Sequence, residues 1–325
     1  MKKILKNKYF LVFVASFIVF TIIIGGSAYY FLGKLSSGRE IFNEIVRDNP
    51  YLKPPDVENH NIVNVLFLGI DDARSDFMVV ARYNKEDGKI AMMSIPRDTR
   101  VEITNYGYDK INSAVARKEG IPLAMDTVSK LLDIPVHYYV ELSFKGMEKI
   151  INKIDGVEIY VPQDMFYSDP TQNLFINIKK GKQVLDGKNS VDFVRYRSGY
   201  ADADLGRIKA QQDFIREFAT KMTSPKIIPK SFSILQDMSN YVKTNMEEKE
   251  IAFYALKLKD LKIDNIKMYT LPGEARYIDK KSYYLCDEQK LRELSFEIEE
   301  ELGIQKSAGE KIETINQEGN LDIKG

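Results

Sequence analysis

The feature that most constrains this chain is an uncharged, strongly apolar run near its N-terminus. Tyr9 to Leu32 contains 24 residues without a charged side chain, and four lysines precede it within eight residues. At about 1.5 Å rise per residue, a helix of this length crosses about 30 Å of hydrocarbon with some tilt. Lysine-rich flanks stay on the cytoplasmic side, so residues 1–8 are expected to be a cytoplasmic stub, and the chain from about Lys34 onward is expected outside the cell.

A cleaved signal peptide is the alternative interpretation of the same run. Gly26 to Ala28 supplies the small residues of a cleavage site. However, the run continues into Tyr29 to Leu32, which is typical of an aromatic anchor at the membrane interface. The favoured interpretation is a single-pass membrane protein, and a stub of about eight residues is too short to hold a DNA-binding or kinase domain.

Composition excludes several classes of function for the outer part. Lys plus Arg equals Asp plus Glu at 47 each, but five of the lysines lie within the first 34 residues, so the remainder carries a net charge of −5. A mildly acidic body does not favour nucleic-acid binding, which needs a basic footprint. One cysteine and two histidines exclude a disulfide framework, a cysteine zinc site and a histidine-rich metal cage.

Proline and glycine positions, hydrophobic periodicity and changes in composition divide the outer part into four segments. Residues 33–61 are rich in Ser, Gly and Pro and indicate a stalk. Residues 62–223 alternate short β-branched runs with helical patterns, which predicts a layered α-β-α domain with a central mixed sheet. Residues 224–304 are poorer in arginine and are expected to be an accessory helical or mixed region, and residues 305–325 a loose polar tail.

Carboxylates follow the first predicted strand, residues 62–70. Asp71 and Asp76 lie in the segment after it, and the carboxyl ends of strands are where open α/β sheets form their sites. Two carboxylates together with substrate phosphate oxygens suit Mg²⁺. The alternative is an ordinary turn in which Asp72 or Asp76 caps the backbone.

A second polar segment follows the strand predicted at residues 89–95. Pro96 ends the strand and turns Arg97 and Asp98 into the loops beyond the sheet. A surface ion pair is the alternative role for these two residues.

Arginines gather in a third segment, where Arg195 and Arg197 precede a helical pattern over about 203–222. Arg is the preferred residue for bidentate phosphate recognition. Asp204 is expected to cap the helix, and Arg207 and Gln211 lie one turn apart on one face. The start of this helix is therefore a candidate anion site.

The same helical face continues into an apolar stripe of Phe214, Phe218 and Met222. A stripe that passes from cations to apolar side chains suits a ligand with a charged head and a lipid tail, which predicts a hydrophobic lipid pocket. Ordinary core packing of the stripe is the alternative. Residues 181–189 superficially resemble a phosphate-binding loop but have the wrong spacing and end in Asn189, so a turn is expected there.

These segments, in this order after one N-terminal apolar span, resemble the LytR-CpsA-Psr family of bacterial cell-wall enzymes. The resemblance runs from about Asn64 to Met222, and the loop between Asp71 and Arg74 is shorter than the glycine-rich version common in the family. The matching stretches are NVLFLGIDD, RSD, SIPRDT, DKINSA, HYYVELSF, DGVEIYVP, VDFVRYR and DLGRIKAQQ.

Such a resemblance implies a fold, a reaction and roles for the candidate residues. Members transfer an anionic glycopolymer (teichoic acid, capsule or a related wall polysaccharide) from a polyprenyl-pyrophosphate carrier to peptidoglycan, with Mg²⁺ or Mn²⁺, on an α/β fold with a lipid pocket. By resemblance, Asp71 and Asp76 hold the metal and Asp98 orients groups or acts as an acid or base. The residues implied to bind the pyrophosphate are Arg97, Arg195, Arg197, Arg207 and Gln211.

Two other functions fit the same sequence. The site would also support hydrolysis of the polyprenyl pyrophosphate with water as acceptor. A non-catalytic, membrane-tethered regulator or lipid-binding protein is the third possibility, although it leaves the acidic residues beside the arginines without a role.

Overall fold

The computed structural model describes residues 52, 61–71, 74–170, 174–198, 203–222, 224, 227, 241–247, 249–251, 253–254 and 262–304. The expected cytoplasmic stub, the membrane span at 9–32, most of the stalk and the tail lie outside these residues. Among the helices of the described ranges, none has the length and apolar character needed to cross a membrane.

A six-stranded mixed sheet forms the centre of the molecule, with the strand order β11-β6-β1-β2-β3-β12. The hairpin expected between residues 77 and 95 is present, with β2 antiparallel to both β1 and β3. β6 runs parallel to β1, and β12 runs parallel to β3. The strands are β1 (Ile62–Asp71), β2 (Arg74–Asn84), β3 (Lys89–Ser94), β6 (Tyr138–Ser143), β11 (Val242–Thr244) and β12 (Ile266–Thr270).

One edge of this sheet collects the strand ends. β1, β3, β6 and β12 run in the same direction, so their last residues lie along a common edge, which we call the carboxyl edge. The residues that end these strands are Asp71, Ser94, Ser143 and Thr270. Candidate sites in open α/β sheets are expected at such an edge.

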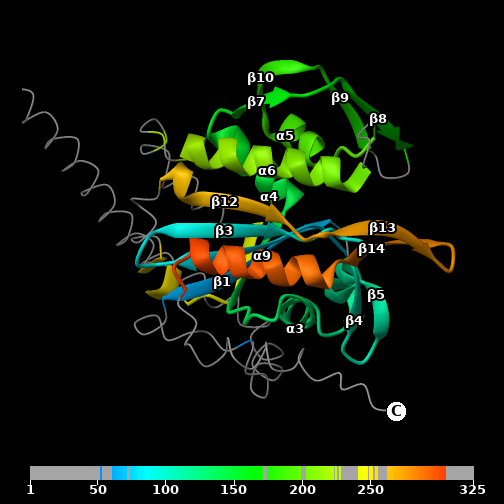
Figure 1. The fold of residues 1–325 in the computed structure, drawn as a ribbon. Helices are drawn as coiled ribbons and strands as arrows, with labels where there is room; N and C mark the ends of the chain where they lie inside the picture. The colour runs from blue at the N-terminus through cyan, green and yellow to red at the C-terminus, as the bar shows by residue number, and fades with distance from the viewer. Residues whose placement is uncertain are drawn as a thin grey trace, which may run out of the picture.

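Helices cover both faces of the sheet, as the interleaved pattern predicts. Figure 1 shows α4 (Phe144–Lys153), α5 (Gly187–Arg195) and α6 (Ala203–Met222) on one side, with α3 (Ile121–Leu132) and α9 (Glu288–Glu301) on the other. Leu66 and Leu68 of β1 belong to the core shared with α3 and α9, whereas Val63 and Val65 pack in a separate cluster with Tyr138. This alternation is the period-two pattern of a strand covered on both faces.

Within the described residues, four two-stranded antiparallel sheets extend the two layers. On the side of α4 to α6, β7 (Val157–Val161) pairs with β10 (Gly181–Leu185), and β8 (Met165–Asp169) pairs with β9 (Leu174–Ile178). On the other side, β4 (Arg100–Ile103) pairs with β5 (Gly107–Lys110) before the 3₁₀ helix η3 (Ile111–Ala116), and β13 (Gly273–Ile278) pairs with β14 (Lys281–Cys286). A further short 3₁₀ helix, η6 (Ile263–Asn265), precedes β12.

Residues after 224, expected to be an accessory region, supply both edge strands of the central sheet. β11 pairs with β6, and β12 pairs with β3 over five residues. Leu291, Ile298 and Leu302, from α9 and its C-terminal cap, pack in the same core as Leu66. The domain boundary drawn after residue 223 therefore does not separate two cores.

The segment 181–189 is a strand and a helix start rather than the expected turn. β10 occupies Gly181–Leu185, and the side chain of Asp186 accepts a hydrogen bond from the backbone N–H of Asn189 at 2.8 Å. Asp186 is thus the N-cap of α5. This cap sets the direction of α5, which carries Arg195 at its last position.

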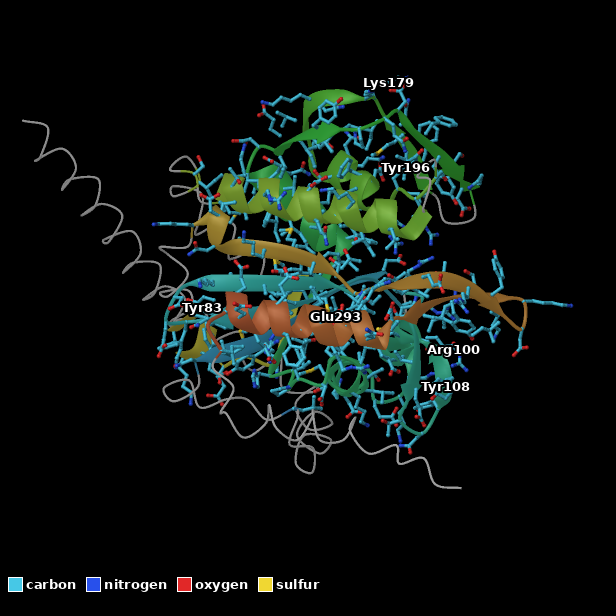
Figure 2. All side chains as sticks on the ribbon, in the orientation of Figure 1. Tyr83, Arg100, Tyr108, Lys179, Tyr196 and Glu293 are labelled. Atoms are coloured by element: carbon cyan, nitrogen blue, oxygen red, sulfur yellow. The ribbon has the colours of Figure 1, made fainter. Side chains whose placement is uncertain are left out.

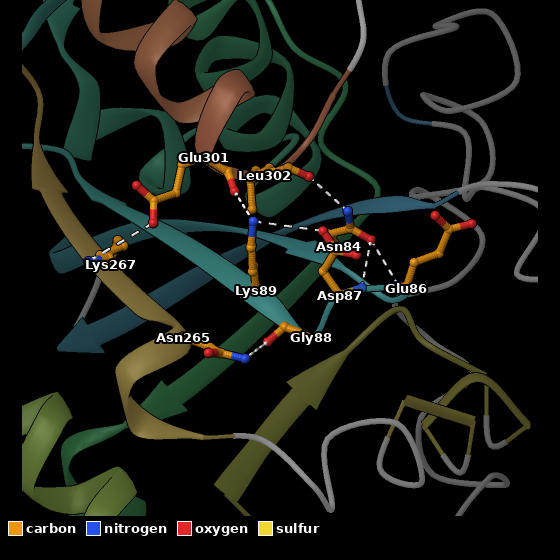
Figure 3. A network of polar contacts seen from close by, with 9 residues as sticks. All are labelled: Asn84, Glu86, Asp87, Gly88, Lys89, Asn265, Lys267, Glu301 and Leu302. Atoms are coloured by element: carbon orange, nitrogen blue, oxygen red, sulfur yellow. Dashed lines mark hydrogen bonds and ion pairs between the residues drawn. The ribbon is translucent and has the colours of Figure 1, made fainter.

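The opposite end of the sheet, which we call the amino edge, holds the network shown in Figure 3. Asn84, at the end of β2, donates from Nδ2 to the carbonyl of Leu302 at 2.8 Å, and Lys89, at the start of β3, donates to the carbonyl of Glu301 at 2.9 Å. Both carbonyls lie at the C-terminal end of α9, where cations and donors are favoured. The amino edge is thereby tied to α9.

Candidate functional site

A β-bulge places Asp76 at the carboxyl edge. Ser75 pairs with Ile70 and Phe77 pairs with Gly69, so Asp76 between them has no partner on β1. Such a bulge changes the direction of a side chain and is common beside active sites. A Cβ atom on Gly69 would lie 2.9 Å from the Cβ of Phe77, so the close approach of the two strands requires glycine there.

Arg97 meets the re-directed carboxylate. Its Nη1 donates to Oδ1 of Asp76, and the two side chains are only 20% and 28% exposed. Arg97 belongs to the turn that Pro96 begins after β3, in which the carbonyl of Pro96 accepts bonds from the N–H of Thr99 at 3.0 Å and its hydroxyl at 2.6 Å. The turn therefore holds Arg97 in place beside Asp76.

Asp98 forms a second ion pair in the same turn. Lys110 Nζ lies 2.8 Å from Asp98 Oδ1, with both side chains about three-quarters buried. The backbone N–H of Tyr284 also donates to the carbonyl of Asp98 at 2.9 Å, which fastens the turn to β14. Lys110 was not among the candidate residues, although it lies in the DKINSA stretch that supports the family resemblance.

Arg195 reaches the same edge from the layer of α4 to α6. Its guanidinium carbon lies 4.9 Å from the ring centroid of Phe144, a cation–π distance. Phe144 directly follows Ser143, the last residue of β6. The contact therefore places Arg195 beside the end of a strand that neighbours β1.

Arg207 lies inside the protein near the start of α6. Only 2% of its surface is exposed, and arginine is seldom so deeply buried unless it serves an anion or a network. Gln211, one turn later, donates from Nε2 to the carbonyl of Val194 at 3.0 Å. The Gln211 amide thus joins α6 to the residue before Arg195, a structural contact that sequence reasoning did not predict.

Gln212 fixes α6 to the carboxyl edge. Its Nε2 lies 3.1 Å from Ser94 Oγ, 2.9 Å from the carbonyl of Tyr269 and 3.1 Å from Thr270 Oγ1. These acceptors lie at the ends of β3 and β12. Sequence reasoning selected Gln211 because it shares a face with Arg207, and the helix periodicity gave no signal for Gln212 on the neighbouring face.

Three other candidate residues, Asp71, Asp204 and Arg197, have no described side-chain contact with the rest of the site. Asp71 ends β1, but its side chain lies outside the described residues, as does that of Asp204. Asp204 is the second residue of α6, inside the first turn, and is therefore not the expected N-cap. Arg197 is exposed two residues beyond α5.

The apolar stripe of α6 packs on the core of the α4 to α6 layer. Phe214 is 6% exposed, with ring centroids 6.4 Å from Phe193 and 6.3 Å from Phe218. Phe218 and Met222 are partly buried against the same core. Phe214 is thus a core residue, and a role for the partly buried pair in holding lipid stays a prediction.

The chemistry of this edge favours an anionic ligand. Arg97, Lys110 and Arg195 bring three cations, Asp76 and Asp98 bring two carboxylates, and Arg207 lies buried near the start of the neighbouring helix α6. Within the described part of the chain, no group of three or more His, Cys, Asp or Glu side chains is arranged to hold a metal. Burial, with the carboxylates of Glu288 and Asp287, raises the pKa of the Cys286 thiol to about 11, so this thiol is protonated at neutral pH and is a poor nucleophile.

Comparisons with known proteins identify the family and the fold of this chain. Residues 29–300 match the model of the LytR_cpsA_psr family. The polyisoprenyl-teichoic acid–peptidoglycan teichoic acid transferase TagT of Bacillus subtilis (strain 168) is 30% identical over 93% of this chain and 98% of its own length. The regulatory protein MsrR of Staphylococcus aureus (strain COL) is 31% identical over 69% of this chain and 68% of its own length.

Solved structures share the fold. The crystal structure of TagV from B. subtilis superposes with a TM-score of 0.65 at 26% identity, covering 76% of this chain and 99% of that one. A structure of TagT bound to LI-WTA gives a TM-score of 0.63 at 29% identity, covering 78% of this chain and 96% of that one. With the family model matched over most of its length, the chain belongs to the LytR_cpsA_psr family.

Proposed function

We propose that this protein transfers an anionic glycopolymer, such as a teichoic acid or capsule polysaccharide, from a polyprenyl-pyrophosphate carrier to peptidoglycan. The observation that carries the proposal is the buried Arg207 near the start of α6. Farther along the same helix, Gln211 bonds to the carbonyl of Val194, the residue before Arg195, and Gln212 bonds to Ser94, which ends the strand before Arg97. The names of the relatives TagT and TagU support it. So does the solved complex of TagT with LI-WTA.

The arginines would act by positioning and charge neutralisation. Their guanidinium groups bind the pyrophosphate oxygens and stabilise the negative charge that develops as the bridging bond breaks. A sugar hydroxyl of peptidoglycan attacks the phosphorus next to the glycopolymer, forming a new phosphate ester, and polyprenyl phosphate leaves. The reaction needs no nucleophilic side chain, in accord with the raised pKa of Cys286.

Asp98 would orient the acceptor hydroxyl or take its proton. The turn after β3 and its bond from Tyr284 hold its backbone, and Lys110 holds its side chain at 2.8 Å.

The carboxylates of Asp76 and Asp71 would hold Mg²⁺ or Mn²⁺. Asp76 Oδ1 accepts from Arg97, which leaves Oδ2 for a second ligand, and Asp71 ends the adjacent strand. Hard oxygen donors in this number suit Mg²⁺ when a substrate supplies phosphate oxygens. The bound ion would supply charge neutralisation at the pyrophosphate.

The uncharged run at residues 9–32 would anchor the catalytic domain to the outer face of the cell membrane. That location brings the domain to both the lipid-linked donor and the wall. We further propose that the carrier's lipid lies along Phe218 and Met222, beyond Arg207 on α6.

Reconstitution with defined substrates tests the function. Full-length protein in detergent is given polyprenyl-pyrophosphate glycan with and without peptidoglycan, and wall-linked glycan and free polyprenyl phosphate are measured. Acceptor-dependent linkage supports the transferase, release of glycan phosphate to water alone supports hydrolysis, and carrier binding without turnover supports the regulatory class that the name of MsrR suggests.

Substitution of the carboxylates tests the metal. Asp71→Asn and Asp76→Asn should each lower Mg²⁺-dependent turnover by roughly tenfold or more, because each removes charge from the site but little core volume. Their melting temperatures should stay near that of the wild type. Wild-type turnover in excess chelator, or full activity of the double variant, would remove the ion from the mechanism.

A further inference from the structure

A groove of about 1200 Å³ opens on the side of the sheet away from α6. Its walls come from α3, the hairpin of β4 and β5, the end of β14 and the outer face of α9. The candidate site described above uses none of the residues that line it. Ligand pockets for small molecules usually enclose about 300 to 1,000 Å³, so a groove of this size suits a segment of polymer.

Exposed aromatic rings and guanidinium groups line the groove. Tyr108 is 60% exposed and Phe296 is 50% exposed, although large apolar rings normally turn inward. The Arg100 guanidinium lies 4.1 Å from the ring centroid of Tyr108, and Figure 2 shows the two side chains together. Among the described residues, no carboxylate pairs with Arg100 or with Arg292 on α9.

The charge of the lining distinguishes the possible occupants. Glu102, Asp133, Glu288 and Glu299 contribute four carboxylates, and Arg100, Lys130 and Arg292 contribute three cations. An anionic glycopolymer would be repelled by the surplus of carboxylates. A glycan strand rich in hydroxyl and amide groups, with peptides that carry both charges, finds aromatic faces for its rings and both donors and acceptors for its polar groups.

The groove connects with the candidate transfer site through one short segment. Arg100, on its wall, is three residues from Arg97, and three residues of extended chain span about 10 Å at most. The ring of Tyr283 lies between Arg100 of the groove and Lys110 of the candidate site. Its centroid is 5.9 Å from Lys110 Nζ and 6.0 Å from the Arg100 guanidinium. The other end of that chain of contacts is Asp98, 2.8 Å from Lys110.

From this placement we infer that the groove binds the peptidoglycan strand that accepts the glycopolymer. The inference rests on the proposed transfer reaction for the identity of the acceptor. The donor reaches Arg97 from the side of α6, and the acceptor reaches it from the side of α9, so the hydroxyl and the pyrophosphate meet at the turn that carries Arg97 and Asp98.

A double variant on α9 tests the groove in the full-length protein. Arg292→Ala with Phe296→Ala removes two exposed side chains one turn apart, and Arg276→Ala with Tyr277→Ala removes a matched exposed pair on β13 that does not line the groove. Co-sedimentation with purified peptidoglycan sacculi, without donor, should weaken by about tenfold or more for the α9 variant and stay unchanged for the β13 variant. Glu102→Ala, on the opposite wall, should also weaken sedimentation, and it leaves α9 untouched.

Transfer kinetics separate this inference from the proposed function. The α9 variant should raise the KM for peptidoglycan by about tenfold, with kcat at saturating acceptor and donor binding within about twofold of wild type. Groove-dependent binding to sacculi without transfer by the wild type would contradict the transferase and leave the groove standing. Wild-type sedimentation and KM in both the α9 and the Glu102 variants would overturn the groove, as would failure of the wild type to bind sacculi.

Discussion

The polar side chains at the amino edge and at the carboxyl edge of the central sheet differ in their partners and their burial. At the amino edge, Asn84 and Lys89 donate to the last carbonyls of α9, so the network is completed by the chain's own groups. At the carboxyl edge, Arg97 pairs with Asp76 and Lys110 pairs with Asp98, and Arg207 lies 98% buried near the start of α6. The amino-edge groups hold the fold together, and under the proposed function the carboxyl-edge groups would also bind an anion.

The largest effect should come from the charge of Arg207. Arg207→Met keeps the length of the side chain and removes its charge-assisted hydrogen bonds, so turnover should fall by roughly 10² to 10³. The melting temperature should change by only a few degrees, because most of the buried volume is retained. Lys89→Met is the matched control at the amino edge, where turnover per folded molecule should be unchanged. Equal loss of turnover in both variants would abolish the distinction between the edges.

Phe218 lies three turns along α6 from Arg207, where a lipid would continue from the pyrophosphate. Phe218→Ala should weaken binding of long-chain carriers more than short-chain analogues, with a loss of stability below the about 3 to 5 kcal/mol of a fully buried phenylalanine. Phe214→Ala, in the core, is the control and should lower stability without changing chain-length preference. Melting temperature and chain-length preference are measured on both. A loss of stability without a change of preference for Phe218→Ala would leave α6 with a charged site and no lipid groove.

The local sequence pattern predicts much of the central sheet. It does not predict the difference between the amino edge and the carboxyl edge. The β-branched run at 62–70 and the turn-rich segment at 84–88 predict β1 and its hairpin because burial on both faces requires continuous apolar residues. The strands β4, β5 and β10 are short and at least half of their residues are polar or glycine, so their sequences resemble loops. β11 and β12 lie at the sheet edges, one with three residues, and the change in composition after residue 224 concealed them.

The site itself was predicted as a set of residues but not as an arrangement. The local sequence does not predict the bulge at Asp76, because the bulge depends on the pairing register between Gly69 and Phe77. The role of Gln212 depends likewise on where α6 crosses β3 and β12. The residue types and the predicted strand ends therefore indicate which side chains lie near the site. Tertiary contacts decide which of these side chains form hydrogen bonds and ion pairs with one another.

A smaller effect is expected at the amino edge from Asn84. This side chain is 5% exposed and also accepts from the backbone N–H of Glu86 at 2.8 Å. Asn84→Ala leaves the Leu302 carbonyl without its donor, which should cost about 1 to 3 kcal/mol. In a domain of this size that lowers the melting temperature by about 2 to 4 °C per kcal/mol. Turnover per folded molecule should be unchanged, and a matching loss of turnover would show that the two edges are coupled.

The smallest expected effect on stability concerns Asp109 near the carboxyl edge. The carboxylate of Asp109 already has hydrogen-bond partners within the protein. Burial acts to raise the pKa of Asp109, but hydrogen bonds from the Lys110 N–H and the Ser113 hydroxyl, with the charge of Arg117, hold it below its usual range. A depressed pKa in the folded state stabilises the protein above the unfolded value of about 3.9, and this contribution is lost as pH falls through the folded pKa. The melting temperature of wild type should therefore exceed that of Asp109→Asn by a constant amount between about pH 5 and 7, and the difference should shrink below about pH 4. Melting curves of both proteins from pH 3 to 7 measure it. A difference that persists undiminished at pH 3 would mean that Asp109 contributes through the shape of its hydrogen bonds rather than through its charge.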